Sequence, residues 1–278
     1  MKVLVIGSTG VLGRNVVPRL VENGHKVRAL VRRHEQAKTY QRMGIETVLG
    51  NILEPESLMI AAEGCGAALH LATAFAKWDW DMTDRIRREG TYNLLKACIE
   101  NHVSKYIQQS IIYLYGDHEE RSVDESVNLN VLPMVESAAD MENQVKDSNL
   151  DWCILRGGSF YGTGTGQNSE WKENARKGTL KIPDGGQAYL SLIHVNDMAR
   201  AVVQAVNLAP SQKIFNVVDD YPVCYEELYQ YIAAMVNGPE PKTGGERFLP
   251  SLNCKNEEIK SALGWKPTFP SFRSGLTE

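Results

Sequence analysis

Short apolar runs alternate with longer amphipathic segments through the first part of the chain. Runs rich in Val, Ile and Leu that are separated by helical patterns indicate βαβ units and a parallel sheet buried on both faces. The sequence therefore predicts an α/β fold with a doubly wound parallel (Rossmann) sheet. The runs are KVLVIG (2–7), HKVRALVR (25–32), IETVLG (45–50), GAALHLA (66–72), KYIQQS (105–110) and LDWCILR (150–156).

The spacing becomes irregular after Arg156. A glycine-rich loop, GGSFYGTGTG, opens this second region. We expect a dinucleotide-binding domain over 1–156 and a smaller substrate-binding lobe over 157–278, partly interleaved with the first. Helices are predicted in the second region at 168–177, 196–208 and 224–236, and strands near 189–194 and 213–218.

Composition excludes several classes of protein. The 278 residues are 43% hydrophobic and 23% charged, with a net charge of −4, so there is no electrostatic basis for binding nucleic acid or an acidic membrane. No apolar stretch reaches the roughly 18 residues of a membrane span, and glycines interrupt the N-terminal run too early for a signal peptide. The five cysteines are widely spaced and form no C-x-x-C pair, which suits neither a disulfide framework nor a zinc site. We expect a soluble cytoplasmic protein with reduced cysteines and no metal.

Three glycines follow the first apolar run and open a helix, in VLVIGSTGVLGRNVV. Gly7 permits a tight turn, Gly10 lets the backbone approach a pyrophosphate, and Gly13 lets the helix pack close to the strand. The first N–H groups of the helix then face the anion. This context predicts a dinucleotide site, although a purely structural turn would have the same pattern.

Arginines stand where a carboxylate would accept the ribose hydroxyls of NAD. Arg32 and Arg33 end the second run, and Arg14 follows the last glycine of the loop. Guanidinium groups bind a 2′-phosphate, which a carboxylate would repel. We therefore expect NADP(H) rather than NAD(H). The alternative is a solvated basic turn.

Further motifs extend along nearly the whole chain, and with the glycine loop they resemble the short-chain dehydrogenase/reductase superfamily. The resemblance is to its extended and atypical branches, often called the NAD-dependent epimerase/dehydratase family. The motifs are GN at 50–51, HLAT at 70–73, GTYNLLKA at 90–97, YG at 115–116, ILRGGSFYG at 154–162, SLIHVNDMARAV at 191–202 and LGWKPTFPSF at 263–272.

The resemblance implies the contacts of a bound cofactor. Asn51 replaces the usual Asp at the adenine, where its amide can still form hydrogen bonds. The implied contacts are Gly7, Thr9, Gly10, Leu12 and Gly13 on the pyrophosphate, Arg32 on the adenosine phosphate, Asn51 and Ile52 on the adenine, and Leu71 and Ala72 at the central ribose.

The family's usual acid and base are substituted. The resemblance implies a Tyr that transfers the proton, a Lys one helical turn later that lowers its pKa, and a Ser or Thr from the fifth strand. Alignment through Glu142 puts Met134 at the Tyr position and Ala138 at the Lys position. The Ser/Thr position falls on Ile111, and a supporting Asn is replaced by Arg87. The usual mechanism is therefore not expected.

Other side chains are candidates for the missing groups. Tyr113 is two residues past Ile111, and a regular strand would turn both toward the cofactor, so we expect Tyr113 to donate the proton, to anchor substrate or to pack in the wall. Ser110 is a second catalytic candidate that would point the other way. The Y-x-x-x-K at Tyr92 and Lys96 lies on a packing helix and is not expected to be catalytic.

Aromatic residues are candidates for a substrate wall. Trp78 and Trp80 in AKWDWDM could stack on a planar or sugar ligand, although a helix cap with packed tryptophans would have the same sequence. Tyr161 and Trp171 are candidates for the rest of the wall.

Three functions fit these features. The first is an atypical NADP(H)-dependent reductase or epimerase that acts on a small carbonyl or sugar-like substrate. The second is a catalytically silent NADP(H)-sensing or regulatory protein, and the third is a lyase or isomerase on the same fold. The resemblance also implies a possible homodimer.

Overall fold

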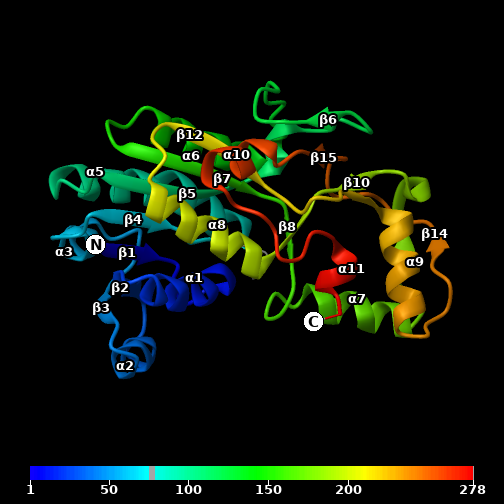
Figure 1. Cartoon of the computed structure of the whole chain (residues 1–278), viewed down its shortest axis with the longest axis horizontal. Coiled ribbons are helices and arrows are strands. Elements are labelled where there is room, and N and C mark those ends of the chain that lie inside the picture. The colour runs from blue at the N-terminus through cyan, green and yellow to red at the C-terminus, as the bar shows by residue number, and fades with distance from the viewer. Residues whose placement is uncertain (75–78, 278) are drawn as a thin grey trace. The chain divides into compact units, whose positions relative to one another are not determined.

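A seven-stranded parallel sheet organises the computed structural model, which describes residues 1–74 and 79–277. Its strand order is β12-β7-β5-β4-β1-β2-β3 (Figure 1). The predicted doubly wound α/β fold is confirmed. The strands are β1 (Lys2–Ile6), β2 (Lys26–Val31), β3 (Glu46–Leu49), β4 (Ala67–His70), β5 (Lys105–Ile111), β7 (Asp151–Gly157) and β12 (Lys213–Val217).

The order of the strands reverses at β1 and β4. β2 and β3 extend from one side of β1, while β4 pairs with its other side, with Ile6 opposite His70 at their carboxyl ends. Loops that leave two such strands diverge, and ligands of open α/β sheets bind in the crevice between them. A ligand site is therefore expected at this edge of the sheet.

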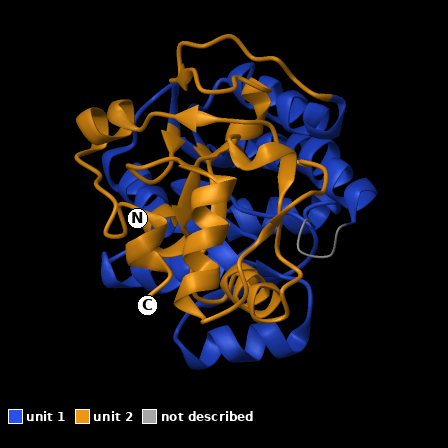
Figure 2. Cartoon of the chain, turned by 90° about the vertical axis from the view of Figure 1, so that its right-hand side faces the viewer, with its two compact units in different colours: residues 1–110, 133–155, 199–215 blue, residues 111–132, 156–198, 216–278 orange. Residues whose placement is uncertain are grey.

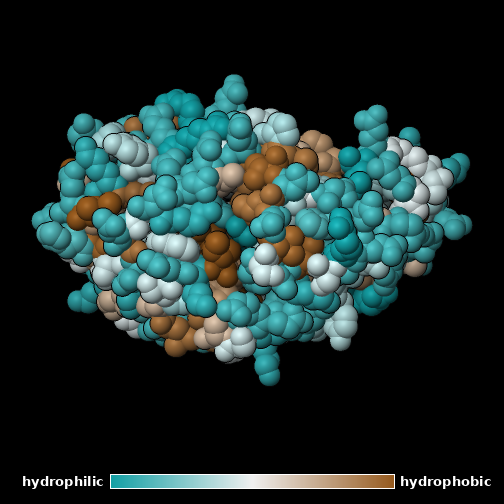
Figure 3. Space-filling view, turned by 90° about the horizontal axis from the view of Figure 1, so that it is seen from above, coloured by the Kyte–Doolittle hydropathy of each residue, from teal (hydrophilic) through white to brown (hydrophobic). Residues whose placement is uncertain are grey.

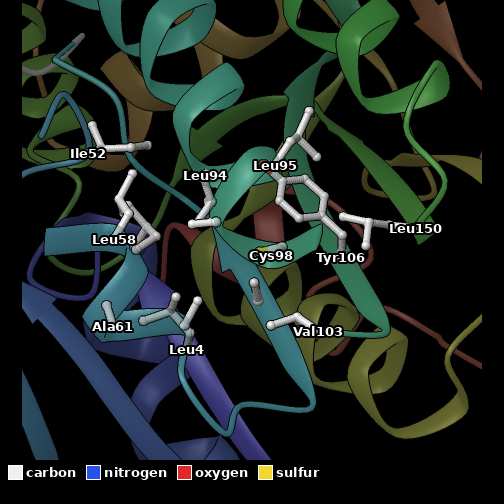
Figure 4. Close-up of a cluster of buried hydrophobic side chains, with 14 of the residues drawn as sticks. Leu4, Ile52, Leu58, Ala61, Leu94, Leu95, Cys98, Val103, Tyr106 and Leu150 are labelled. Carbon is white, nitrogen blue, oxygen red and sulfur yellow. The ribbon is translucent and has the colours of Figure 1, made fainter. Parts of the chain in front are cut away.

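Helices α3, α5 and α6 follow one another against the sheet, and Figure 4 shows part of the core beneath α3 and α5. Leu4 from β1, Leu58 from α3, Leu94 from α5 and Tyr106 from β5 are fully buried in this cluster. The strands are apolar on both faces because helices cover both faces of a parallel sheet. The helices around the sheet are α1 (Val11–Glu22), α2 (His34–Arg42), α3 (Pro55–Ala62), α5 (Thr91–Glu100), α6 (Glu136–Lys146) and α8 (Val195–Leu208).

A helix with an irregular turn follows β4. It runs through α4 (Trp80–Arg85), the π-helical turn η2 (Ile86–Gly90) and then α5 without a break in the chain. Single π-helical turns inside longer helices are rare and occur frequently at functional sites. Residues 86–90 are therefore candidates for a functional role.

The chain forms two compact units, which Figure 2 colours separately. Unit 1 comprises residues 1–110, 133–155 and 199–215, and unit 2 comprises 111–132, 156–198 and 216–278. The two units therefore alternate along the chain more than once, and the division at residue 156 stays a prediction.

Unit 2 is built from short elements and two-stranded pairs. In unit 1, the 3-10 turn η4 (Pro133–Val135) precedes α6. A buried cluster that includes Tyr161, Trp171 and Phe272 forms an apolar core of unit 2. Its elements are η3 (Ile112–Tyr115), β6 (Ser122–Val123), β8 (Ser159–Tyr161), α7 (Gln167–Arg176), β9 (Lys181–Ile182), η5 (Pro183–Gly186), β10 (Tyr189–Leu190), β11 (Leu192–His194), β13 (Val223–Cys224), α9 (Tyr225–Met235), β14 (Lys242–Thr243), β15 (Asn253–Cys254), α10 (Glu257–Leu263) and α11 (Phe272–Gly275).

Hydrophilic residues predominate on the surface seen in Figure 3, and the hydrophobic areas there are separate from one another. Within the described residues, no helix is both long enough and apolar enough to cross a membrane.

Candidate functional site

The glycine loop is packed too closely for side chains at two of its three glycines. A Cβ on Gly7, whose φ is +83°, would lie 2.6 Å from the backbone N of Ala72. A Cβ on Gly13 would lie 2.2 Å from the carbonyl oxygen of Gly7. At Gly10 the same test finds, within the described chain, only the Gly7 carbonyl oxygen, at 3.2 Å. The loop is therefore tight against the end of β4 and less crowded at Gly10, at the N-terminus of α1, where a Cβ would still make a close contact.

The predicted cofactor residues at the end of β4 lie directly against this loop. The backbone N–H of Leu71 donates a hydrogen bond of 3.0 Å to the carbonyl of Ile6, the last residue of β1. Leu71 is buried and Ala72 is half-buried. Leu12 is also buried, in the first turn of α1, so it can offer an anion its backbone N–H but not its side chain.

Gln36 links the glycine loop to the end of β2. Its Oε1 accepts hydrogen bonds of 3.2 Å from the backbone N–H groups of both Arg32 and Arg33, and its Nε2 donates to Oγ1 of Thr9 at 3.3 Å. One turn later on α2, the Tyr40 hydroxyl donates a hydrogen bond of 2.7 Å to the carbonyl of Ser8. Sequence reasoning missed both residues, whose only signal is that they share one face of the helix after the arginines.

The arginines themselves are exposed. Arg14, Arg32 and Arg33 all have exposed side chains, and within the described residues neither Arg32 nor Arg33 forms an ion pair. Burial raises the pKa of the Tyr40 phenol, and the positive charge of Arg14 opposes that rise. Arg14 and Tyr40 are therefore close enough to interact beside the loop. This arrangement leaves the guanidinium groups of Arg32 and Arg33 available to a phosphate.

Asn51 and Ile52 follow β3 and are held by their neighbours. Oδ1 of Asn51 accepts a hydrogen bond of 3.2 Å from the backbone N–H of Leu53, which leaves one lone pair of that oxygen for a ligand. Ile52 is buried, and a Cβ on Gly90 would lie 3.1 Å from its side chain. Asn93 of α5 donates to the Ile52 carbonyl at 3.4 Å. The helix that carries η2 thus supports the predicted adenine residues.

The substituted acid and base positions lie where α6 begins. Met134 is half-buried in η4, and Ala138 is fully buried in the first turn of α6. Ser110, at the end of β5, donates a hydrogen bond of 2.7 Å from Oγ to Oε1 of Glu142, and both side chains are buried. The Ser110 hydroxyl is therefore committed to α6, and its catalytic role stays a prediction.

The expectation that Tyr113 continues a regular strand from Ile111 was wrong. β5 ends at Ile111, and residues 112–115 form the 3-10 helix η3, so the two side chains do not alternate as in a strand. Within unit 2, the Tyr113 hydroxyl forms a hydrogen bond with Oγ of Ser159. Burial raises the pKa of Tyr113 to about 12, so the phenol is neutral at physiological pH and a weak acid. Its role as a proton donor stays a prediction.

Arg87, the residue at the supporting Asn position, is a buried cation. Only 8% of it is exposed, and its Nη1 donates a hydrogen bond of 3.2 Å to Oγ of Ser137, the residue before Ala138. Burial lowers its pKa to about 10, which leaves it protonated at neutral pH. His70, at the end of β4, is also buried, and burial lowers its pKa to about 4, with the charge of Arg87 acting in the same direction.

The other Y-x-x-x-K pair lies on the surface. Tyr92 is 62% exposed on α5, and Nζ of Lys96 lies 3.9 Å from a carboxylate oxygen of Glu100. These contacts are those of an ordinary solvated helix face.

The predicted substrate wall receives little support. Trp78 lies outside the described residues, and Trp80 begins α4, where Asp79 caps the helix by accepting a hydrogen bond of 3.0 Å from Met82 N–H. In unit 2, Tyr161 is fully buried and donates a hydrogen bond of 2.8 Å to Oδ2 of Asp219. Trp171 is buried in the same apolar cluster, so packing is favoured for both. No group of three potential metal ligands gathers among the described residues.

Comparison with known proteins identifies the cofactor class. A family model described as NAD(P)H-binding matches residues 7–208, which includes the glycine loop and the residues around it. The chain belongs to this NAD(P)H-binding family. Membership confirms the resemblance to the extended and atypical short-chain dehydrogenases and establishes NAD(P) as the cofactor class.

Several known proteins are similar to this chain. A 3-diazoavenalumate denitrifying reductase from a Streptomyces species is 31% identical over 99% of this chain and 99% of its own. A photosystem II assembly factor from Synechocystis is 28% identical over 78% of this chain and 62% of its own. The solved structure of DesIV, a dTDP-glucose 4,6-dehydratase from Streptomyces venezuelae with NAD bound, superposes with a TM-score of 0.85 over 99% of this chain and 94% of that chain. At 20% identity, this last likeness shows the fold alone.

Proposed function

We propose that this protein is an NADP(H)-dependent reductase that acts on a small carbonyl or sugar-like substrate without the family's Tyr–Lys pair. The observation that carries the proposal is the cofactor loop of unit 1. Gly7 and Gly13 leave no room for side chains where the loop leads into α1. Two arginines follow the end of β2, with no carboxylate paired to them among the described residues.

The residues of unit 1 divide the work of holding the cofactor. The N-terminal N–H groups of α1 bind the pyrophosphate, because the partial positive charge of a helix N-terminus favours an anion. Arg32 binds the 2′-phosphate with parallel N–H donors, and Arg33 and Arg14 add positive charge. Gln36 holds the backbone at Arg32 and Arg33 next to the Thr9 side chain through its three hydrogen bonds. When bound, NADPH supplies the hydride for reduction.

Reduction is favoured over the other reactions of the fold by the full-length likeness to a reductase. The Streptomyces protein is matched over 99% of both chains, so both units have counterparts there. Without a Tyr–Lys pair, the proton comes from water, from the substrate or from a residue outside the usual positions. A positioned acid accelerates a reaction by roughly 10² to 10⁴. Without one, we expect either a slow reduction or a reduction whose hydride transfer does not require a simultaneous proton transfer.

A catalytically silent NADP(H)-binding protein is the second candidate. The substitutions at Met134 and Ala138 favour it, and the second relative is described as an assembly factor and not as an enzyme. Both candidates require NADPH to bind, so binding alone cannot separate them.

Turnover separates the two. Purified protein is incubated with NADPH and a panel of ketones, enones and sugar nucleotides, and cofactor oxidation is followed together with product formation. Steady turnover supports the reductase, and a proton donor at Tyr113 would be revealed if Tyr113→Phe abolishes it. NADPH that binds tightly but is never consumed across the panel would favour the silent protein.

A further inference from the structure

Arg87 carries a buried guanidinium that uses little of its hydrogen-bonding capacity within the described part of the chain. Within the described residues, its one hydrogen bond runs from Nη1 to Oγ of Ser137, and no carboxylate forms an ion pair with it. A guanidinium has five N–H donors. Only 8% of this charged residue is exposed, and one of its donors has a partner among the described residues.

The neighbouring arginine forms ion pairs, whereas Arg87 forms none with the residues that the structure describes. Arg88, whose side chain is 41% exposed, lies 2.6 Å from a carboxylate oxygen of Asp140, 3.4 Å from Glu136 and 3.7 Å from Asp84. Three carboxylates thus lie within ion-pair distance of the exposed cation. Among the described residues none lies that close to the buried one, which only the more distant charge of Asp84 stabilises. An unpaired buried charge is strongly unfavourable, because it loses its hydration without gaining a counter-ion. A negatively charged group on a bound ligand would supply the missing counter-ion.

The position of Arg87 fits a ligand at the cofactor edge of the sheet. It lies on the π-helical turn η2, and its partner Ser137 immediately precedes Ala138, whose side chain ends at Cβ. The effect of its charge on His70 places it near the carboxyl end of β4, the strand that ends beside the glycine loop. A buried positive charge is therefore provided here by Arg87 on η2, whereas the resemblance implies a lysine on α6, at the position of Ala138.

The unused donors indicate which anion fits. Ser137 engages Nη1, which leaves Nε and Nη2. These two nitrogens carry parallel N–H bonds that match the two oxygens of a carboxylate. Phosphate offers the same oxygen chemistry, but in this chain the α1 N-terminus and Arg32 already provide for the phosphates of the cofactor. A carboxylate on the substrate is the occupant that these donors favour.

We propose that Arg87 binds a carboxylate group of the substrate beside the cofactor. The inference rests on the proposed reductase function and narrows it, because it makes the substrate a small carboxylic acid that carries a reducible group. Ser137 acts as a positioning residue that fixes one side of the guanidinium. Arg87 supplies from a neighbouring helix the positive charge that Ala138 cannot provide.

The test measures small carboxylates on the full chain loaded with NADP⁺. Benzoate is titrated by calorimetry against benzamide, which has the same shape without the charge. Wild type should bind benzoate at least roughly tenfold more tightly than benzamide. Arg87→Met should abolish the preference and Arg87→Lys should retain part of it. Arg88→Met, which removes the adjacent exposed arginine, should leave the preference unchanged.

Two further readouts distinguish binding from a structural role and from the cofactor. Benzoate should raise the melting temperature of wild type and not that of Arg87→Met. Without ligand, Arg87→Met should melt no lower than wild type, since it removes a largely buried charge that has no ion-pair partner among the described residues. NADP⁺ affinity should change by less than roughly threefold in Arg87→Met. A large loss of NADP⁺ affinity would assign Arg87 to the cofactor and overturn the inference.

Other outcomes also decide the matter. Equal binding of benzoate and benzamide by wild type, or benzoate binding that survives in Arg87→Met, would overturn the inference. If wild type binds no NADP⁺, the proposed reductase function fails by itself. The melting shift caused by benzoate in the unloaded chain then still tests Arg87 independently.

Discussion

Oγ of Ser110 donates a hydrogen bond of 2.7 Å to Oε1 of Glu142, which joins the end of β5 to the middle of α6 inside unit 1. The pair fixes the position of α6, the helix that carries Ser137 and Ala138. Because both side chains are buried, the bond is also a considerable part of local stability.

Ser110→Ala should destabilise the protein without weakening cofactor binding. The change leaves a buried carboxylate with one hydrogen bond fewer, which costs roughly 1–3 kcal/mol of unfolding free energy. Urea denaturation measures the loss, and Ser169→Ala, at an exposed position of α7, is the control. A Ser110→Ala variant of unchanged stability that has lost its turnover would instead make Ser110 a catalytic residue.

Arg32→Ala should weaken NADPH far more than NADH. Only NADPH has the 2′-phosphate that the guanidinium binds, and a charge-assisted bidentate contact is worth roughly 10- to 100-fold in affinity. Fluorescence titration of both cofactors measures the difference. Arg42→Ala, at an exposed arginine in the last turn of α2, should leave both affinities unchanged. An equal loss for NADH and NADPH would contradict the NADP assignment.

Gly13→Ala should damage both the fold and the cofactor site. Its Cβ would lie 2.2 Å from the Gly7 carbonyl oxygen, so α1 must move away from the loop. We expect a loss of roughly 3 kcal/mol in unfolding free energy and a loss of NADPH binding. Gly66→Ala is the matched control, because its Cβ would meet its nearest neighbour at an ordinary 3.7 Å. A normal affinity for NADPH in Gly13→Ala would show that the loop does not hold the cofactor.

The stability of the protein should fall as the pH decreases from about 6.5 to about 4 because of His70. Its pKa is 6.5 in the unfolded chain and about 4 in the folded chain, so within this window the unfolded state binds a proton that the folded state does not. The stabilisation is complete above pH 6.5, and roughly 3 kcal/mol of it is lost by pH 4.

Urea denaturation at a series of pH values checks the effect of His70. His70→Gln should flatten the dependence over this window, whereas His34→Gln, at an exposed position, should not. An identical slope in wild type and His70→Gln would remove His70 as the cause.

Local patterns predicted much of the fold. The helix expected at 168–177 is α7 (Gln167–Arg176), that at 196–208 is α8 (Val195–Leu208), and that at 224–236 is α9 (Tyr225–Met235). These elements follow the periodicity of their own residues, which is visible in one short window. The glycine loop was predictable for the same reason, because its three glycines, strand and helix are contiguous.

The rest depends on residues that are far apart in the sequence. The apolar run IIYLY looks like more of β5, but the chain turns into η3 after Ile111, and only the structure shows this. The hydrogen-bonded residues Ser137 and Arg87 are 50 positions apart in the sequence, and Thr9 and Gln36 are 27 apart. No local sequence pattern predicts either pair. The cap at Asp79 is the exception, since an Asp before a helix is itself a start signal.

Deuteride transfer tests the central claim most directly. NADPH labelled with deuterium at C4 of the nicotinamide is incubated with the wild-type chain and the panel of carbonyl and carboxylate-bearing substrates. We predict that the wild-type chain transfers deuterium from labelled NADPH to at least one substrate. The same transfer should not occur from labelled NADH, or from labelled NADPH in the Gly13→Ala variant. Tight NADPH binding with no deuterium transferred to any substrate would contradict the reductase and leave a protein that only binds its cofactor.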